Sequence, residues 1–536
     1  METINTTNIS SEEKVKNLEI VSDDKLVIDF INKAFQEKIN ISEFAKIFKE
    51  LREKYKETSF IGNRKNNSGI IEIGGDPGKS GIERKTNNLD GVLDYHFETD
   101  DDVNKKEIIS PRQAAKKYFD IDVEKGLASM DKAKRRNLAK ETSIVRYLEG
   151  DGPNKIILDF FDNGTGIRQL DFHKTILSLN ESNKIGKLHL MGQYGQGGSS
   201  TFNYSDFTLI ASRHHKSNTL SFTVVWYKQP EIDEKKGSYV YLTHNRHPLA
   251  VKFENIKDLP YKKGVFIRHF GYDLSKYRSG RGQGSLYLLL QKSLFNPPLP
   301  FYFMNKVDSY GNRTIKGSRA AFLGGLDPED KDSKLEIIYS DSISEKKISG
   351  GKLGSIKIEY WVVKNVRSKF NKETGKRDNP VNPLLNHTQK YKPIIFTHNG
   401  QTQHEGSNSL IKHQMGFEYL KDTLVIHVEC DSLSIDAKRN FFASNREAAK
   451  EGTSEYSAII DSLVDHLKSD SKLEELNLKA AEEIASDDET LTKSDLQKDI
   501  SKFIEATGGT FAGVMGQSPS GKGTVSVPGT GNSGGG

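Results

Sequence analysis

The stretch Lys155-Ile-Ile-Leu-Asp-Phe-Phe-Asp-Asn-Gly-Thr-Gly166 carries the strongest structural signal in the chain. Its apolar residues are too continuous for an edge strand, so they predict a strand that is buried inside a sheet. The strand ends abruptly at Asp162, and the glycines at 164 and 166 allow the chain to turn and its backbone to approach a ligand closely. Considered alone, Asn163-Gly164 after a strand indicates only a turn.

A second polar motif lies upstream, in Glu83-Arg-Lys-Thr-Asn-Asn-Leu-Asp-Gly91. In a helix, Glu83, Asn87 and Asp90 stand at i, i+4 and i+7 and therefore share one face. Considered without its neighbours, this pattern indicates a solvated polar stripe.

A third motif follows, Gly192-Gln-Tyr-Gly-Gln-Gly-Gly-Ser-Ser200. Its glycines allow backbone N–H groups to face phosphate oxygens, and Ser199 can open a helix whose N-terminus favours anions. The polar segment before it, 180–189, has the composition of a lid over a ligand. As a lone pattern, this stretch is a common flexible loop.

In this order, ExxxNxxD at 83–90, DxGxG at 162–166 and GxxGxG at 192–197 resemble the nucleotide site of the GHKL superfamily. That group contains DNA gyrase B, the heat-shock chaperones, sensor histidine kinases, the MutL mismatch-repair proteins and the MORC proteins. The resemblance implies an ATP and Mg²⁺ site in which Asn87 binds the metal and Glu83 activates the attacking water. It assigns Asp162 to the adenine amino group and Asp90 to a polar contact on the nucleotide side. The other implied nucleotide contacts are Gly164, Gly166, Gly192, Gly195, Gly197, Gly198 and Ser199.

The chemistry of these residue types agrees with the resemblance. Mg²⁺ prefers oxygen ligands and bridges phosphates, and a carboxylate can orient and deprotonate water. Two residues depart from the family pattern: Gly91 stands where alanine is usual, and Val265 replaces a threonine that joins the adenine contacts. Either Thr223 supplies the missing hydroxyl, or Asp162 and water hold adenine.

The interval between Asn87 and the DxGxG motif is longer than we expect for the family. We interpret the surplus, about 98–142, as an inserted surface element. Within it, Asn137 is a rival metal ligand, but residue 133 is alanine where the acid should be. Glu83 and Asn87 are therefore the better pair.

The apolar pattern predicts an α+β protein with more than one domain. Residues 1–68 form an N-terminal segment with two amphipathic helices, which pack on the next domain or mediate dimerisation. Residues 69–290 form a domain that the resemblance makes a Bergerat-type α/β sandwich, with an antiparallel or mixed sheet and helices on one face. We expect a short strand at Ile70–Ile73 and a helix that starts at Asp76-Pro77 or at Ser80.

The second half resembles other parts of the same family. Residues 291–470 are similar in order and size to the transducer domain, of the ribosomal S5 domain 2 type, and they are followed by a charged helical segment (471–506) and a disordered Gly/Ser-rich tail (507–536). Transducer domains commonly send a basic residue to the γ-phosphate. The candidates are Lys438, Arg439 and Arg446, although a basic surface turn has the same composition.

Composition narrows the function classes. The net charge of +5 is slight for 536 residues, so it permits contact with nucleic acid without arguing for it. A single cysteine, Cys430, suits a reducing compartment, and neither a membrane span nor a signal peptide is visible, which predicts a cytoplasmic protein. Residues 1–82 contain no histidine, which argues against a histidine kinase with an acceptor upstream.

Together these features predict a slow, Mg²⁺-dependent ATPase that acts as an ATP-driven conformational switch or clamp. Family resemblance adds a homodimer that forms on ATP binding, and DNA or a partner protein as its target, in DNA transactions or phage defence. The alternative is a non-hydrolysing, nucleotide-dependent interaction protein of chaperone type.

Overall fold

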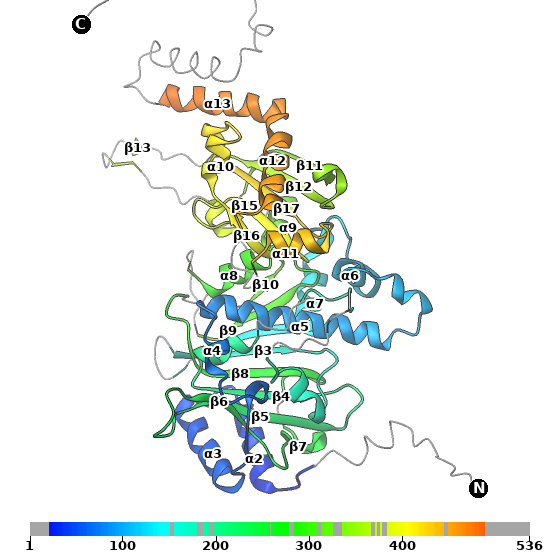
Figure 1. The fold of residues 1–536 in the computed structure, drawn as a ribbon, viewed down its shortest axis with the longest axis vertical. Helices are drawn as coiled ribbons and strands as arrows, with labels where there is room; N and C mark the ends of the chain where they lie inside the picture. The colour runs from blue at the N-terminus through cyan, green and yellow to red at the C-terminus, as the bar shows by residue number, and fades with distance from the viewer. Residues whose placement is uncertain are drawn as a thin grey trace, which may run out of the picture. The chain divides into compact units, whose positions relative to one another are not determined.

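A computed structural model describes residues 21–148, 150, 155–179, 184, 186–192, 198–257, 259–277, 284–307, 312–324, 335–365, 370–371, 376–377, 383–443 and 449–487. The chain divides into two compact units, residues 1–470 and 471–536. The first unit is a mixed α and β structure whose strands gather in two large sheets (Figure 1).

The larger sheet contains ten strands. They are β1 (Thr58–Phe60), β2 (Ser143–Leu148), β3 (Lys155–Asp162), β4 (Phe207–Arg213), β5 (Thr219–Lys228), β6 (Ser238–Leu242), β7 (Leu249–Lys252), β8 (Gly264–Asp273), β9 (Phe301–Asn305) and β10 (Arg313–Ile315). Their order is β1-β6-β5-β4-β8-β3-β2-β9-β10, with β7 also paired to β5. Among the strands that the structure describes in this sheet, only β2 and β9 pair in parallel, so the sheet is mixed. It continues past residue 290, where we expected the first domain to end.

Strand β3 lies between β8 and β2 and confirms the predicted buried strand. Its side chains alternate between two hydrophobic clusters, as the two-residue period of a strand requires. Leu158 and Phe160 join one cluster, and Ile157 and Phe161 join the other. Asp162 ends the strand on the face of Phe160, so the alternation of β3 decides which face carries the carboxylate.

Helix α5 (Pro77–Thr99) covers the face that carries Phe160, and its Leu89 and Leu93 belong to the same cluster. The helix begins as predicted, because the Asp76 carboxylate accepts from the Lys79 N–H at 2.9 Å and proline occupies the first turn.

The opposite face is covered by α2 (Lys25–Ala34) and α3 (Ile41–Lys54), which confirm the two amphipathic helices. Phe30 stacks on Phe222 of the sheet with ring centroids 5.9 Å apart. The expectation of helices on one face only is therefore wrong, because the apolar stripes of these helices bury the second face.

A buried ion network fixes this packing. The Asp159 carboxylate accepts from Arg146 Nε and Arg268 Nε, each at 2.7 Å, and Arg268 Nη1 donates to the carbonyl of Ala34 at 2.7 Å. The network therefore ties the end of α2 to the centre of the sheet.

The predicted strand at Ile70–Ile73 is wrong, because residues Ser68–Ile71 form the short helix α4. Asn67 explains the difference. Its side chain pairs with both backbone groups of Tyr239 on β6, accepting from the N–H at 2.8 Å and donating to the carbonyl at 2.7 Å. This side-chain pairing supplies the contact to β6 that a strand would have made.

The inserted segment is not a surface element, contrary to our expectation. It contains the helices α6 (Pro111–Phe119) and α7 (Lys132–Thr142), and Ala114 of α6 and Leu127 of the intervening 3-10 helix Gly126–Ser129 join the cluster under α5. Arg135, from the basic run on α7, is also buried and donates to the carbonyls of Leu127 and Met130.

The smaller sheet has five strands, β11 (Ile337–Lys347), β12 (Ser355–Val363), β15 (Ile394–His398), β16 (Gln401–Gly406) and β17 (Leu424–Glu429). Their order is β11-β12-β17-β15-β16, and β15 and β17 are parallel. Two short strands, β13 (Phe370–Asn371) and β14 (Lys376–Arg377), pair separately.

The other helices of the first unit are α8 (Leu286–Ser293), α9 (Ser318–Gly324), α10 (Asn408–His413), α11 (Ile435–Phe441) and α12 (Ser454–Lys468). In the second unit, α13 (Ser471–Asp487) occupies the start of the predicted charged helical segment. Within the described residues, no helix has both the length and the apolar character needed to span a bilayer.

Candidate functional site

The Asp162 carboxylate is buried at the end of β3 and accepts from three donors. Its Oδ1 accepts from the Gly164 N–H at 2.8 Å and from the Val265 N–H at 3.4 Å, and its Oδ2 accepts from Asn88 Nδ2 at 2.6 Å. Burial raises the pKa of Asp162 to about 6, and these hydrogen bonds oppose the rise only in part. Asp162 is therefore a strong hydrogen-bond acceptor that the fold shields from solvent.

Helix α5 and the turn after β3 approach each other closely at their glycines. A Cβ built on Gly164 would lie 2.3 Å from the carbonyl carbon of Gly91, and the Thr165 N–H donates to the Gly91 carbonyl at 3.0 Å. Gly166 has a φ of +74°, which a residue with a Cβ rarely adopts. The glycines of this motif are therefore required by the backbone, and they bring Asp162 against α5.

Asp90 holds the start of the glycine-rich segment. It is only 2% exposed, and its carboxylate accepts from the Met191 N–H at 2.7 Å and the Gly192 N–H at 3.1 Å. Asp90 is thus a structural partner of the predicted phosphate-binding segment.

Asn87 is exposed and lies one turn before Asp90 on α5. The ammonium group of Lys184 bridges the two side chains. Lys184 Nζ, from the predicted lid, donates to Asn87 Oδ1 at 2.7 Å and to Asp90 Oδ2 at 2.5 Å. The two oxygens therefore converge on one position that a positive charge can occupy. Oxygen ligands that converge in this way fit a hard cation such as Mg²⁺.

The far end of the glycine-rich segment lies against the same helix. A Cβ on Gly198 would lie 2.9 Å from Arg84 Nη1 and 3.2 Å from Asn87 Nδ2, so a larger residue there would displace the ends of these two side chains. Ser199 begins a short 3-10 helix, Ser199–Tyr204, as the sequence suggested. The predicted contacts Gly195 and Gly197 lie outside the described residues.

A residue of the second sheet reaches the proposed catalytic acid. Gln401 Nε2 on β16 donates to Glu83 Oε1 at 2.9 Å, and Asn399 Nδ2 donates to the Met191 carbonyl at 3.2 Å. The turn between β15 and β16 makes this approach, and a Cβ on its Gly400 would collide with the Asn296 carbonyl at 1.9 Å. Sequence reasoning missed Gln401, and the Asn-Gly turn was the available signal.

Two of the three basic candidates of the second half lie on α11 (Ile435–Phe441). Lys438 Nζ donates to the carbonyl of Asp431 at 2.7 Å, and Arg439 is exposed on α11. Arg446 lies outside the described residues. The rival metal ligand Asn137 is exposed on α7.

Valine stands at position 265 where a threonine was expected, and a hydroxyl nearer to it than that of Thr223 belongs to Ser212. The Thr223 hydroxyl donates to the Leu242 carbonyl at 2.7 Å on the far side of β5. Ser212, which pairs with Val265 across β4 and β8, donates to the Gly264 carbonyl at 2.9 Å and accepts from the Ile167 N–H at 2.7 Å. Ser212 is therefore the hydroxyl that borders the turn after Asp162.

Comparison of the chain with models of known protein families gave no match, and comparison with curated proteins gave none.

Proposed function

We propose that this chain binds ATP with Mg²⁺ and hydrolyses it slowly, as a GHKL-type protein with a Bergerat-type first domain and a transducer-like second domain. The observation that carries the proposal is the convergence of Asn87 and Asp90 on one cation position, on the helix that also carries Glu83. The buried acceptor Asp162 lies against the same helix, whose Asn88 donates to the Asp162 carboxylate at 2.6 Å.

Each group has a distinct task in the proposed reaction. Glu83 takes a proton from water as the water oxygen bonds to the γ-phosphorus, and the bond from that phosphorus to the β,γ-bridging oxygen breaks. The electron pair leaves with ADP. Gln401 keeps the Glu83 carboxylate oriented through its 2.9 Å hydrogen bond. Bound Mg²⁺, held by Asn87, would neutralise phosphate charge.

Two contacts support a switch role for the same reaction. Gln401 contacts Glu83, and Asn399 contacts Met191, so residues at the edge of the second sheet touch both the proposed base and the start of the glycine-rich segment. A change in lid position on nucleotide binding is thereby linked to the second sheet. If Glu83 were inactive as a base, the same links would still serve a non-hydrolysing switch.

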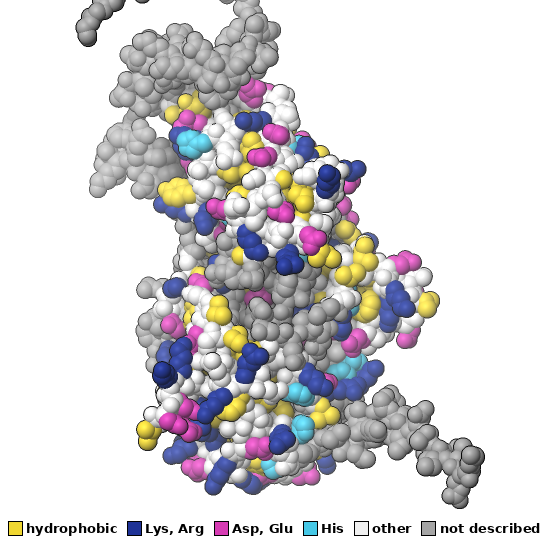
Figure 2. All heavy atoms as spheres, viewed as in Figure 1, with side chains coloured by type: hydrophobic (Ala, Val, Ile, Leu, Met, Phe, Trp, Pro, Cys, Tyr) yellow, Lys and Arg dark blue, Asp and Glu magenta, His cyan; other side chains and the backbone are white. Residues whose placement is uncertain are grey.

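The face of the molecule drawn in Figure 2 does not support DNA binding. Its described Lys and Arg side chains are spread among Asp and Glu side chains and form no single basic patch. This distribution agrees with the slight net charge of +5.

The test is a phosphate-release assay on the purified chain with ATP and Mg²⁺. We expect turnover in the wild type and a loss of about 10²- to 10⁴-fold in Glu83→Ala, with nucleotide binding retained, because the general base is removed. The matched control is Glu72→Ala, which removes a carboxylate near the surface, 3.4 Å from Lys236. Equal hydrolysis by wild type and Glu83→Ala would reject the catalytic role, and absent ATP binding would reject the proposal.

A further inference from the structure

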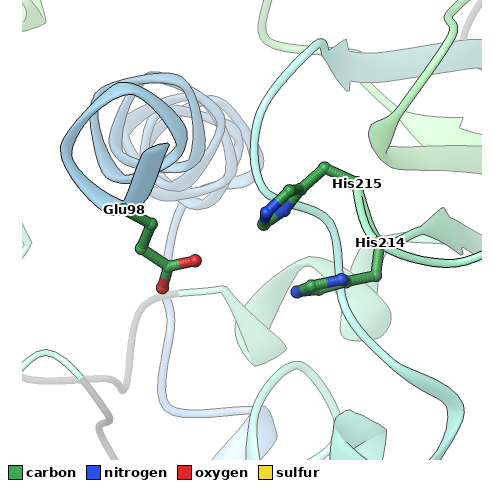
Figure 3. Close-up of side chains that lie close together, drawn as sticks. All are labelled: Glu98, His214 and His215. Atoms are coloured by element: carbon green, nitrogen blue, oxygen red, sulfur yellow. The ribbon is translucent and has the colours of Figure 1, made fainter. Parts of the chain in front are cut away.

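Three donor side chains meet beside the turn that follows Asp162. They are Glu98 near the end of α5, and His214 and His215 after β4, and each offers a ligand atom within 4.8 Å of the others. Figure 3 shows the two rings and the carboxylate directed at one space between the helix and the loop. In the part of the chain that the structure describes, no other His, Cys, Asp or Glu group has this geometry.

A local turn explains why neighbouring histidines can share one target. Adjacent side chains of an extended strand point to opposite faces. Here β4 ends at Arg213 and the chain turns, with the Ser217 N–H donating to the His214 carbonyl at 2.9 Å. The two rings consequently lie on the same side, with centroids 4.4 Å apart and planes 32° apart.

His215 is prepared as a ligand. Its Nδ1 lies 3.3 Å from the Thr165 carbonyl, which places the ring proton on Nδ1 and leaves a lone pair on Nε2. Within the described residues, Nε2 is buried and has no hydrogen-bond partner. A buried ring nitrogen with a free lone pair, oriented through its other nitrogen by a carbonyl, is the arrangement that metal-bound histidines show.

His214 and Glu98 complete the donor set. The His214 ring is half-buried, and its centroid lies 4.4 Å from that of His215, so both rings border the same space. His214 Nδ1 accepts from the Lys216 N–H at 3.2 Å, and coordination through Nε2 would move the ring proton to Nδ1 and open that contact.

The ion pair that Glu98 makes with Lys187 is the longer of the two that this lysine makes, so the Glu98 carboxylate can exchange it for a metal ion. Lys187 Nζ lies 2.6 Å from Asp94 but 3.5 Å from Glu98. Glu98 is also partly exposed, so its side chain can change rotamer.

We propose that Glu98, His214 and His215 form a binding site for a transition-metal ion of the Zn²⁺ class. Two imidazoles and one carboxylate suit Zn²⁺, with water as a fourth ligand, and they do not suit Mg²⁺ or Ca²⁺, which prefer oxygen ligands. Around a tetrahedral zinc the donors stand about 3.3 Å apart, so small side-chain rotations bring the present set into range.

A metal bound at this site would stabilise the turn that carries the DxGxG motif. The His215 N–H donates to the Thr165 carbonyl at 2.9 Å, and the Thr165 N–H donates to Gly91 of α5 at 3.0 Å. A metal that joins Glu98 to His215 would close this loop of contacts between α5 and β4. The inference does not depend on nucleotide binding, because it concerns metal affinity and stability alone.

The experiment uses the full chain without a histidine tag, treated with a chelator and then titrated with Zn²⁺ or Co²⁺. We expect one equivalent bound per chain, a rise in melting temperature with Zn²⁺, and visible absorption from four-coordinate Co²⁺. His215→Ala should weaken binding by about 100-fold or more, and Glu98→Gln by at least about 10-fold. The control is His413→Ala, which removes an exposed histidine of α10 and should bind as the wild type does.

Circular dichroism establishes that each variant is folded. Glu98→Gln stays decisive if His215→Ala does not fold, because residue 98 is at the exposed end of its helix. Absence of binding by the wild type overturns the proposal. Wild-type affinity in folded Glu98→Gln together with folded His215→Ala also overturns it, because the ion would then be bound elsewhere.

Discussion

Replacing Asp162 by asparagine should weaken nucleotide binding and stabilise the free protein at the same time. Asparagine has the same shape and keeps one oxygen for the Gly164 and Val265 N–H groups. Its new amide can be satisfied as well, because Asn88 Oδ1 is buried without a partner among the described residues and a flip of the Asn88 amide presents it. The folded structure therefore tolerates the change, but the charged acceptor is lost.

The stability gain follows from the pKa. The carboxyl shifts from an ordinary value of 3.8 to about 6, which corresponds to about 3 kcal/mol of unfavourable ionisation in the folded state. Because the folded protein binds the proton more tightly than the unfolded chain, stability falls as the pH rises from about 4 to about 6. Asp162→Asn should therefore be more stable than wild type at pH 7, by up to about 3 kcal/mol, and the difference should shrink at pH 4.

The loss of affinity follows from the proposed adenine contact. A hydrogen bond to a charged acceptor contributes about 1.5–3 kcal/mol, so the Kd for ATP should rise roughly 10- to 150-fold. Urea unfolding at pH 7 and pH 4 measures the stability, and calorimetric titration with ATP measures the Kd.

Asp159 provides the control on the same strand. It is equally buried but lies between Arg146 and Arg268. Arg146 also pairs with Glu37, but Asp159→Asn leaves the buried Arg268 without its carboxylate partner and should destabilise the fold by about 3–5 kcal/mol. The same substitution three residues apart should thus change stability in opposite directions. An Asp162→Asn protein that is destabilised at pH 7, or that binds ATP as the wild type does, would refute the reasoning.

Three further outcomes are expected. Gln401→Ala should lower kcat about 10-fold and leave the Kd for ATP within about threefold, in single-turnover and binding assays, because it removes only the hydrogen bond that orients Glu83. Below pH 6 the affinity for ATP should fall as Asp162 takes up a proton, by no more than the same roughly 10- to 150-fold, and it should fall less steeply in Asp162→Asn, where only the phosphate of ATP titrates. Glu359→Gln should cost about 3–5 kcal/mol in urea unfolding, because Arg319, which donates to both carboxylate oxygens, would be buried without its counter-charge.

These outcomes have their own controls. Gln414→Ala removes an exposed glutamine at the end of α10 and should leave kcat unchanged. Two opposing effects act on the Glu359 carboxyl. Burial alone would raise its pKa, but hydrogen bonds from Arg319 and His427 hold the pKa below its usual range. Unchanged stability in Glu359→Gln would mean that the ion pair is offset by its desolvation.

Local features of the first domain could be predicted because they depend on neighbours in sequence. The Asp76 cap sets the start of α5, and the two-residue alternation of β3 sets which side chains face α5. The segment at Ile70–Ile73 could not be predicted in this way, because its conformation depends on Asn67 pairing with Tyr239, 172 residues away.

By itself, the sequence determined the central strand, the helix that faces it, and the polar motifs at their ends, since periodicity and capping act over a few residues. Only the tertiary structure decided that Gln401 meets Glu83, 318 residues earlier, and that α2 and α3 cover the second face of the sheet. It also brought Glu98 to His214 and His215. Such long-range contacts depend on the order of the strands and on which faces of the sheet are buried. No short stretch of sequence carries that information.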